Sequence, residues 1–371
     1  MLFVEPFYDG SHAAFLDGLR AHSQHEIVPL TLPGGEWRQR MRRGAAELHG
    51  LFPDDATHFD LVVATDMLDL PIWLALTRQR FAGTPVLYYL HENQLTYPRL
   101  KGTKFNSWFG AMNYNSALVA DAVAFNSEYH RQDFFGALRT LGAQPNNWIA
   151  TTGIEAIMAR SDVLPVGVEL NWLDALAPSQ CTSSEPLILW NHRWEFDKAP
   201  DVFARAVTAL AAEGLAFRLA LAGDPGVNPH PAMQALREAL AGHIVQFGRV
   251  ESREAYGRLL WESDIVVSTT RHEFFGIGMV EALYAGCFPV APARYNYPDL
   301  VPEHLHPQCL YEDESGLLDL LRTALRQRPV TYSLRQSAAR FRWQQVAPQW
   351  DRAMESIAAS YRRHSFQGNA L

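Results

Sequence analysis

The sequence predicts an α/β protein with two Rossmann-like domains, each built on a parallel sheet. Short runs of apolar and β-branched residues alternate with helix-length segments along most of the 371 residues, as in successive βαβ units. The alternation fails once, at 171–186, where Pro, Ser and Thr are frequent, and then begins again. Because open parallel sheets bind ligands beyond the carboxyl ends of their strands, we expect the two domains to face each other across a cleft.

The expected elements follow in chain order. Residues 1–170 form the first domain, with strands expected in MLFVEP, HEIVPLTL, DLVVAT, TPVLYYLHEN, AVAFNS and an extended stretch ending at PVGVEL. Residues 171–186 form a linker. Residues 187–340 form the second domain, with strands expected in PLILWNHR, FRLALAGD, HIVQFGRV, DIVVSTT and CFPVAP. The last segment, 341–371, has a helical pattern, and we expect it to pack back on the first domain.

Composition narrows the class of protein. The formal net charge of −8 argues against a surface that binds nucleic acid indiscriminately, although the segment 37–43 is densely basic. Three cysteines without a C-x-x-C pair argue against a disulfide framework and fit a reducing compartment. The apolar runs are strand-sized, far shorter than the roughly 20 residues of a membrane helix. We therefore expect a soluble, cytoplasmic protein without a membrane partner.

The strongest motif, RHEFFGIGMVEALYAG, follows the strand expected in DIVVSTT. A helix that begins there presents free N–H groups and a positive dipole end, and its glycines let a diphosphate approach the backbone of Phe275, Gly276 and Ile277. Glu281 suits the two hydroxyls of a ribose, and Glu273 can face the reacting sugar. The alternative is that both glutamates only compensate the helix dipole. The order of strand, glycines and helix favours a donor-binding site.

A second motif, WNHRWEFDK, follows the strand expected in PLIL. Arg193 and Lys198 can clamp a diphosphate from the side opposite the helix N-terminus, and such charge-assisted contacts can replace a metal ion. The alternative is a surface pairing of these cations with Glu195 and Asp197. The neighbouring motif favours the clamp.

Three further residues lie at strand ends where a nucleotide base can sit. They are Gly223, Arg249 and Val250. Gly223 is equally well explained as an ordinary turn glycine. No D-x-D motif occurs in the sequence, so we expect no metal site and no cofactor.

The first domain also carries polar residues after its strands. His91 and Asn93 follow VLYYL, where they suit sugar hydroxyls, and His91 alternatively is a buried structural histidine. Gly10, Ser11 and His12 follow the first strand and are candidates for acceptor binding. A single glycine is a weak phosphate-binding loop, because two or more usually cradle a phosphate.

In these motifs the sequence resembles glycosyltransferase family 4. HEFFGIGMVEALYAG and NHRWEFDKAP are similar to its donor-binding segments, LHEN to its sugar-contact segment and PVGVEL to its interdomain crossing. EPFYDGSHAAF, TLPGGEWRQR, YYLHENQLTYP and ILWNHRWEFDKAP resemble, more narrowly, the tRNA-queuosine α-mannosyltransferase group. The resemblance implies a GT-B fold, GDP-mannose as the donor and queuosine in tRNA-Asp as the acceptor.

Carried over motif by motif, the resemblance implies a role for each candidate. Glu281 would hold the ribose, Arg193 and Lys198 the diphosphate, and His91 and Glu273 the transferred sugar. It also implies retention of the anomeric configuration without an enzymic nucleophile. The loop at Gly10 has one glycine where many family members have two.

A tRNA acceptor needs a basic surface, which the segment 37–43 provides. Its candidates for tRNA contact are Trp37, Arg38, Arg40, Arg42 and Arg43. A solvated helix face explains them equally well. Two other functions remain open: a glycosyltransferase with a lipid or polysaccharide acceptor, and a nucleotide-sugar-binding protein without catalysis. The motifs also leave the sugar open among mannose, glucose and galactose, and the base between guanine and uracil.

Overall fold

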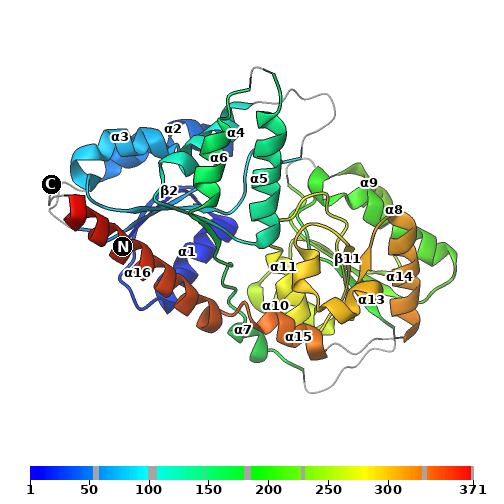
Figure 1. The fold of residues 1–371 in the computed structure, drawn as a ribbon. Helices are drawn as coiled ribbons and strands as arrows, with labels where there is room; N and C mark the ends of the chain where they lie inside the picture. Colours follow the sequence, from blue (N-terminus) through cyan, green and yellow to red (C-terminus); the bar gives the residue numbers. More distant parts are fainter. Residues whose placement is uncertain are drawn as a thin grey trace. The chain divides into compact units, whose positions relative to one another are not determined.

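The computed structural model describes residues 1–52, 58–98, 107–145, 147–178, 185–226, 230–327 and 332–368 (Figure 1). The chain divides into two compact units, of which the first comprises Met1–Gly167 with Trp343–Leu371 and the second Val168–Arg342. Residues 179–184 of the predicted linker, with Cys181, lie outside the described residues. Cys287 and Cys309 are free and buried.

The first unit contains a six-stranded parallel sheet in the order β2-β1-β3-β4-β5-β6. Its strands are β1 (Leu2–Tyr8), β2 (Val28–Pro33), β3 (Val62–Thr65), β4 (Val86–Leu90), β5 (Ala122–Phe125) and β6 (Ser161–Val163). β1 pairs with β2 on one side and with β3 on the other, Leu2 lying beside both Val28 and Val62. The chain reverses its direction across the sheet here, which makes β1 and β3 the topological switch point.

The extended stretch expected to end at PVGVEL contains β6 only in its first part. β6 ends at Val163, and beyond it Val168 forms an isolated bridge to Arg342. Pro165 lacks the N–H that a ladder requires, and the chain leaves the sheet here to enter the second unit.

Helices cover both faces of the first sheet. They are α1 (Gly10–His22), α2 (Trp37–Leu51), α3 (Leu70–Phe81), α4 (Ser107–Val119), α5 (Glu128–Gly142), α6 (Thr151–Met158) and α16 (Trp343–Gly368). α1 contacts α16 on one face, and α2, α3, α4, α6 and α5 form a row on the other (Figure 1). Side chains at Asp9, Glu36 and Ser127 cap α1, α2 and α5.

The helix α16 is anchored in the core of the first unit by two tryptophans. Trp343 and Trp350 are completely or almost completely buried, and Trp350 donates a hydrogen bond to the Pro165 carbonyl at 3.0 Å. A Cβ placed on Gly18 would lie 2.2 Å from Trp343, and one on Gly167 would lie 2.3 Å from it. The indole therefore occupies space that is open only because both of these residues are glycines.

The second unit contains another six-stranded parallel sheet, in the order β12-β11-β10-β7-β8-β9. Its strands are β7 (Leu187–Trp190), β8 (Arg218–Ala222), β9 (Ile244–Gly248), β10 (Ile265–Val267), β11 (Phe288–Pro292) and β12 (Leu310–Tyr311). Read from β9, this is the strand order 3-2-1-4-5-6 of a Rossmann fold, with the switch point between β7 and β10. The two predicted parallel-sheet units are thus confirmed.

The helices of the second unit form two groups. They are α7 (Asn171–Asp174), α8 (Pro200–Ala212), α9 (Pro231–Ala239), α10 (Arg253–Glu262), α11 (Ile277–Ala285), α12 (Tyr297–Leu300), α13 (His306–Cys309), α14 (Glu314–Gln327) and α15 (Tyr332–Ala339), with short 3₁₀ turns at Phe196–Lys198 and Glu303–Leu305. α8 contacts α9 and α14, and α11 contacts α10 and α15 (Figure 1). No described helix combines the length and apolar composition of a membrane span.

The start of the predicted linker is packed within the second unit. Asp174, at the end of α7, accepts hydrogen bonds from Tyr284 at 2.7 Å, Arg335 at 2.7 Å and Arg342 at 2.9 Å. These partners lie on α11, α15 and the segment after α15. The described part of 171–178 is therefore an integral element of the second unit.

Candidate active site

Two loops with charged side chains meet at the switch point of the second sheet. They follow β7 and β10, which are paired neighbours that run in the same direction. Thr269, after β10, donates a hydrogen bond to the main-chain oxygen of Lys198 at 2.9 Å. Thr270 donates one to the main-chain oxygen of Asp197 at 3.1 Å. The loop after β7 is thereby fixed to the loop after β10.

The ammonium group of Lys198 lies between two carboxylates. Its Nζ is 3.4 Å from Oε2 of Glu273 and 3.3 Å from Oδ2 of Asp197, and its side chain is only 12% exposed. Burial opposes the charge on Lys198, but the two carboxylates outweigh burial and raise its pKa. Lys198 is therefore a fixed positive charge at the strand ends.

Two neighbouring histidines stay uncharged. Burial, reinforced by the positive charge of Lys198, lowers the pKa of His192 and of His272 to about 4. Burial alone would raise the pKa of Glu273, but Lys198 and the two imidazoles lower it. At neutral pH the loops thus present the ammonium of Lys198, the ionised carboxylate of Glu273 and two neutral rings.

The N-terminus of α11 is built for close approach. Gly276 precedes it with a φ of 97°, and no side chain of the described residues caps it. Its first N–H groups are therefore open to an anionic ligand, at the positive end of the helix dipole. Asn191, after β7, donates a hydrogen bond to the Gly278 carbonyl at 2.9 Å. A Cβ on Gly278 would lie 3.1 Å from that amide nitrogen.

Glu281 lies one turn further along α11. It accepts a hydrogen bond from the Tyr256 hydroxyl at 3.1 Å, and that hydroxyl accepts one from Asn191 at 3.0 Å. Burial raises the pKa of Glu281 to about 7, although the bond from Tyr256 and the charge of Arg253 favour ionisation. A carboxylate at this position can accept hydrogen bonds from the two vicinal hydroxyls of a ribose. The phosphates attached to that ribose would then lie at the N-terminus of α11.

Arg193 occupies a different environment from Lys198. Its guanidinium lies 3.2 Å from Oε1 of Glu195, and its side chain is 64% exposed. Its charge still reaches Lys198, whose pKa it lowers. The ion pairs named as the alternative to a clamp, with Glu195 and Asp197, are both present. The predicted clamp thus consists of one buried and one exposed cation.

The other predicted donor-binding residues surround these loops. Gly223 follows β8, and a Cβ there would lie 1.8 Å from the main-chain oxygen of His192, so only glycine fits. The remaining positions differ in exposure: Phe275 is buried, Ile277 and Val250 are half-buried, and Arg249 is exposed.

A second polar cluster lies at the switch point of the first sheet. Glu5, in the middle of β1, is completely buried, and its Oε2 lies 3.1 Å from Nδ1 of His12 on α1. His91 follows β4, with its ring 4.3 Å from that of His12. Asp66 follows β3 and accepts the His91 N–H at 2.8 Å. The structure thus brings His12 and His91 together, which were predicted separately.

Other first-unit candidates surround this cluster. Gly10 starts α1 with a φ of 50°, and its N–H is accepted by Asp9 at 2.7 Å. Ser11 is exposed. Asn93 is fully buried, and its side-chain oxygen accepts the N–H of Leu95 at 3.0 Å. Asn93 therefore organises the turn after β4.

Basic and aromatic side chains gather at the starts of α2 and α4. This cationic–aromatic surface consists of Trp37, Arg38, Arg42, Arg43 and Trp108. The Arg38 guanidinium lies 4.4 Å from the Trp37 ring, and that of Arg42 lies 5.7 Å from the ring of Trp108, which is 44% exposed. Alternating cations and rings suit the phosphates and bases of an unpaired nucleic-acid strand.

The cationic–aromatic surface adjoins the edge that carries His91. A helix that follows a parallel strand begins at the carboxyl edge of the sheet, so α2 and α4 both start there. Arg40 differs from its neighbours, because it donates hydrogen bonds to Glu47 at 2.9 Å and to the Gly34 carbonyl at 3.5 Å. Arg40 therefore anchors α2.

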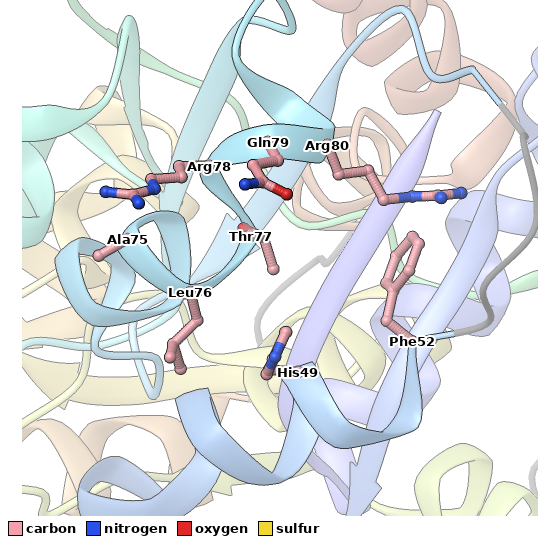
Figure 2. A pocket seen from close by; sticks show the side chains of 8 residues that line it. All are labelled: His49, Phe52, Ala75, Leu76, Thr77, Arg78, Gln79 and Arg80. Carbon is pink, nitrogen blue, oxygen red and sulfur yellow. The ribbon is translucent and has the colours of Figure 1, made fainter.

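A cavity of about 640 Å³ lies at the other ends of α2 and α3 (Figure 2). It is lined by His49, Phe52, Ala75, Leu76, Thr77, Arg78, Gln79 and Arg80. The Arg80 guanidinium lies 4.5 Å from the Phe52 ring (Figure 2). These helix ends are at the edge of the sheet opposite Glu5 and His91, so the cavity does not belong to the strand-end site.

Several residues of the two clusters were not singled out from the sequence. Glu5 and Asp66 had a usable signal, because each is a carboxylate in or directly after an apolar strand. Tyr256 had none, since it is one residue of an ordinary helix.

The fold of this chain is similar to that of solved structures. A sucrose-phosphate synthase from Thermosynechococcus elongatus is similar with a TM-score of 0.70 and 14% identity, over 97% of this chain and 99% of that chain. A glycosyltransferase from Rickettsia africae is similar with a TM-score of 0.66 and 14% identity, over 96% and 98%. The fold is thus the GT-B class that the sequence predicted.

The sequence narrows the class to one family. Residues 1–168 match the family described as tRNA-queuosine alpha-mannosyltransferase N-terminal, and residues 185–327 match glycosyl transferases group 1. A tRNA-queuosine alpha-mannosyltransferase of Drosophila melanogaster is 32% identical over 317 residues, which cover 82% of this chain and 82% of that protein. This chain belongs to the tRNA-queuosine α-mannosyltransferase family of glycosyltransferases.

Proposed function

We propose that this chain transfers mannose from GDP-mannose to the queuosine base of tRNA-Asp, with retention of configuration and without a metal ion. The observation that carries the proposal is the largely buried Lys198–Glu273 pair in the loops at the N-terminus of α11, in a chain of this family. Family membership supports the donor sugar and the acceptor. The pair and the helix end support the chemistry.

The second unit would bind the donor. The diphosphate would lie at the N-terminus of α11, with Lys198 and Arg193 as its cations and with the ribose hydroxyls on Glu281. Lys198 already holds a positive charge between carboxylates, so it would exchange part of that pairing for the phosphates. Glu273, next to Lys198, would accept hydrogen bonds from the sugar.

The reaction breaks one bond at the anomeric carbon and forms another. The bond from C1 of mannose to the diphosphate oxygen breaks, and its electron pair leaves with GDP. A queuosine hydroxyl attacks C1 from the same face, and its proton passes to the departing phosphate oxygen. Lys198, Arg193 and the helix dipole would stabilise the charge that develops on the diphosphate, which is the role a divalent cation plays elsewhere.

The first unit would bind the acceptor. The cationic–aromatic surface would contact tRNA through phosphates and stacked bases, and His91 would contact the transferred sugar. Gly10 and Ser11, at the start of α1, would contact the acceptor beside His12. Arg38, Arg42 and Arg43 are exposed and therefore accessible to phosphates.

The decisive experiment incubates the purified protein with GDP-mannose and tRNA-Asp in EDTA. One tRNA carries queuosine and the matched control carries unmodified guanine at the same position. Nucleoside digestion and mass spectrometry should show one added hexose on queuosine alone, and NMR should show the α-anomer. Transfer to neither tRNA, transfer to both, or transfer that appears only when Mg²⁺ or Mn²⁺ is restored would each contradict the proposal.

A further inference from the structure

The buried carboxylate of Glu5 has no role in the donor chemistry. Burying an ionised carboxylate is costly unless it is paired, and here both oxygens have partners. Oε1 accepts the N–H of Phe7 at 2.8 Å, and Oε2 lies 3.1 Å from Nδ1 of His12. The cluster lies at the switch point of the first sheet, where α/β proteins bind ligands.

His12 is the positive partner of this carboxylate. Burial opposes its charge, but Glu5, helped by Asp66 and Glu92, outweighs burial and raises the pKa of His12 to about 9. The distance between Nδ1 and Oε2 is that of a charge-assisted hydrogen bond. Below this pH, Glu5 and His12 form a buried ion pair.

His91 is held rigidly beside the pair. Its N–H donates to Asp66 at 2.8 Å, and its carbonyl accepts from the Asn126 amide at 2.8 Å. The rings of Phe15 and Tyr89 pack edge-on against the imidazole, at 4.9 and 4.8 Å. Packing on this scale fixes a single ring orientation.

That orientation determines which ring nitrogen carries the proton. Nε2 of His91 is buried, has no hydrogen-bond partner among the described residues and lies 4.0 Å from Oε2 of Glu5. A carboxylate favours a proton on the nearer nitrogen, while the adjacent His12 cation disfavours a second positive charge. The small exposed part of the side chain, 10%, therefore lies away from Nε2.

We propose that Glu5 and His12 are positioning residues that keep His91 neutral, with its proton on Nε2, so that Nδ1 accepts a hydrogen bond from a substrate hydroxyl. The inference rests on the proposed function, in which His91 touches the reacting sugar. An imidazole that accepts through one fixed nitrogen can orient a hydroxyl, which a rotating or protonated ring cannot.

The surrounding charges support a neutral His91. The ionisable groups around its ring are Glu5 on β1, His12 on α1, Asp66 after β3, Glu92 after β4 and His130 on α5. Burial, followed by the charges of His12 and His130, lowers the pKa of His91. Burial also raises the pKa of Asp66. The positioning pair is intact below the His12 pKa of about 9 and is lost as the pH rises through it.

The first test reads the tautomer directly and needs no acceptor. The full-length protein is labelled with ¹⁵N-imidazole histidine, and the His91 signals are assigned by their loss in His91→Gln. We expect the shifts of a neutral ring protonated on Nε2 at neutral pH, and a mixture of tautomers in Glu5→Gln. A ring protonated on Nδ1, a charged ring, or shifts unchanged in Glu5→Gln would overturn the inference.

The second test separates positioning from a general loss of structure. In Glu5→Gln and in His12→Gln, kcat should fall by about 10²-fold while the KM for GDP-mannose stays constant. The kcat of the double variant should be no lower than that of the less active single variant, because the two residues act as one pair. The alkaline fall in kcat near pH 9 should disappear in both variants. Additive losses or an unchanged kcat would contradict the pair.

A matched control is available in the same unit. His25 and Glu355 form another His–Glu pair, 3.2 Å apart, outside the cluster. His25→Gln should leave kcat and the tautomer of His91 unchanged. If Glu5→Gln fails to fold, His12→Gln carries the same readouts.

A metal ion in the cluster would overturn the inference. The ligand atoms of Glu5, His12 and His91 lie within 4.8 Å of one another, and two imidazoles with a carboxylate are a known zinc ligand set. Stoichiometric zinc in the purified protein that is lost from His12→Gln would show that ligation, not positioning, explains the cluster. The expected tautomer without mannose transfer would instead leave the positioning intact and refute the proposed function.

Discussion

At the scale of single residues, the side chains proposed to bind the donor already have partners within the second unit. Lys198 touches Asp197 and Glu273, and Glu281 touches Tyr256. A diphosphate and a ribose would therefore replace existing partners of these side chains. Lys198 is therefore desolvated when the protein folds and not when the donor binds, as in a preorganised site.

Replacing Lys198 by methionine should lower kcat/KM by about 10- to 100-fold, because one charge-assisted contact contributes about 1.5–3 kcal/mol. The change should also lower the melting temperature, since Asp197 and Glu273 lose their buried cation. Steady-state kinetics and thermal denaturation measure the two effects. Arg322→Met, which removes exposed ion pairs on α14, is the control and should leave kcat/KM unchanged. An unaltered kcat/KM in Lys198→Met would refute the clamp.

Binding of GDP-mannose should weaken as the pH falls below about 7, the raised pKa of Glu281. A protonated carboxyl accepts fewer hydrogen bonds from the ribose, so Kd should rise by up to about tenfold per pH unit. GDP-mannose is the right probe, because its doubly esterified diphosphate does not titrate in this range. Isothermal calorimetry should show the dependence in the control Glu262→Gln and not in Glu281→Gln. A pH-independent Kd in the unaltered protein would argue against ribose binding at Glu281.

The sequence reveals these residues unevenly. Glu273 and Glu281 are recognisable because strand, glycines and helix follow one another locally, so position along the chain determines position in space. Tyr256 joins Glu281 to Asn191 across three elements. Only the tertiary packing of α10 against α11 creates that contact, so no local sequence pattern predicts it. Asn93 shows the reverse, since it sits at a strand end yet is fully buried.

At the scale of elements, the arginines of α2 lie in different environments. Arg40 is bonded to Glu47, whereas Arg42 and Arg43 are exposed. Arg40 reaches Glu47 because positions seven apart, two turns along α2, lie on one face of a helix. The basic run is visible in the sequence, but the exposed ring of Trp108, brought beside it by α4, is not.

Arg42→Glu combined with Arg43→Glu should raise the KM for tRNA by about 10- to 100-fold, because two phosphate contacts become repulsive. The dependence of tRNA affinity on salt should weaken by about one unit of slope for each lost contact. Filter binding at several salt concentrations measures this. Arg78→Glu with Arg139→Glu is the matched control, with the same change of net charge on α3 and α5. Equal effects of the two double variants would show that the arginines of α2 act only through the net charge of the protein.

Trp343→Ala should destabilise the first unit by about 3–5 kcal/mol, the usual cost of truncating a buried tryptophan. Trp343 fills the space beside Gly18 and Gly167. Its removal leaves a cavity that these glycines cannot fill, because they have no side chains. Urea denaturation followed by fluorescence gives the free energy of unfolding. Trp148→Ala, at a position 38% exposed, should cost much less. Equal losses would mean that α16 contributes little to the core.

The end of the last strand of the first unit is less visible in the sequence than the exit that follows it. The resemblance of PVGVEL to an interdomain crossing indicates the exit, and Pro165 cannot donate to a ladder. Apolar alternation alone does not show where β6 stops, because the same apolar residues can pack in a core without strand pairing. Val168 and Leu170 are indeed buried.

At the scale of the whole molecule, the second unit is one uninterrupted stretch with adjacent ends. Val168 donates its N–H to Phe341 at 2.7 Å and forms a bridge with Arg342. We expect residues 168–342, produced alone, to fold cooperatively and to bind GDP-mannose with an affinity close to that of the full chain. Circular dichroism and calorimetry test this, with Glu281→Gln in the same fragment as the control. A fragment that unfolds without cooperativity would show that each unit needs the other.

The split composition of the first unit also bears on its biogenesis. Residues 1–167 leave the ribosome early, but α16, which supplies Trp343 and Trp350 to their core, is translated last. The nascent amino-terminal part must therefore keep an apolar face uncovered until the second unit and α16 have been made. In this protein the order of synthesis and the order of maturation are reversed.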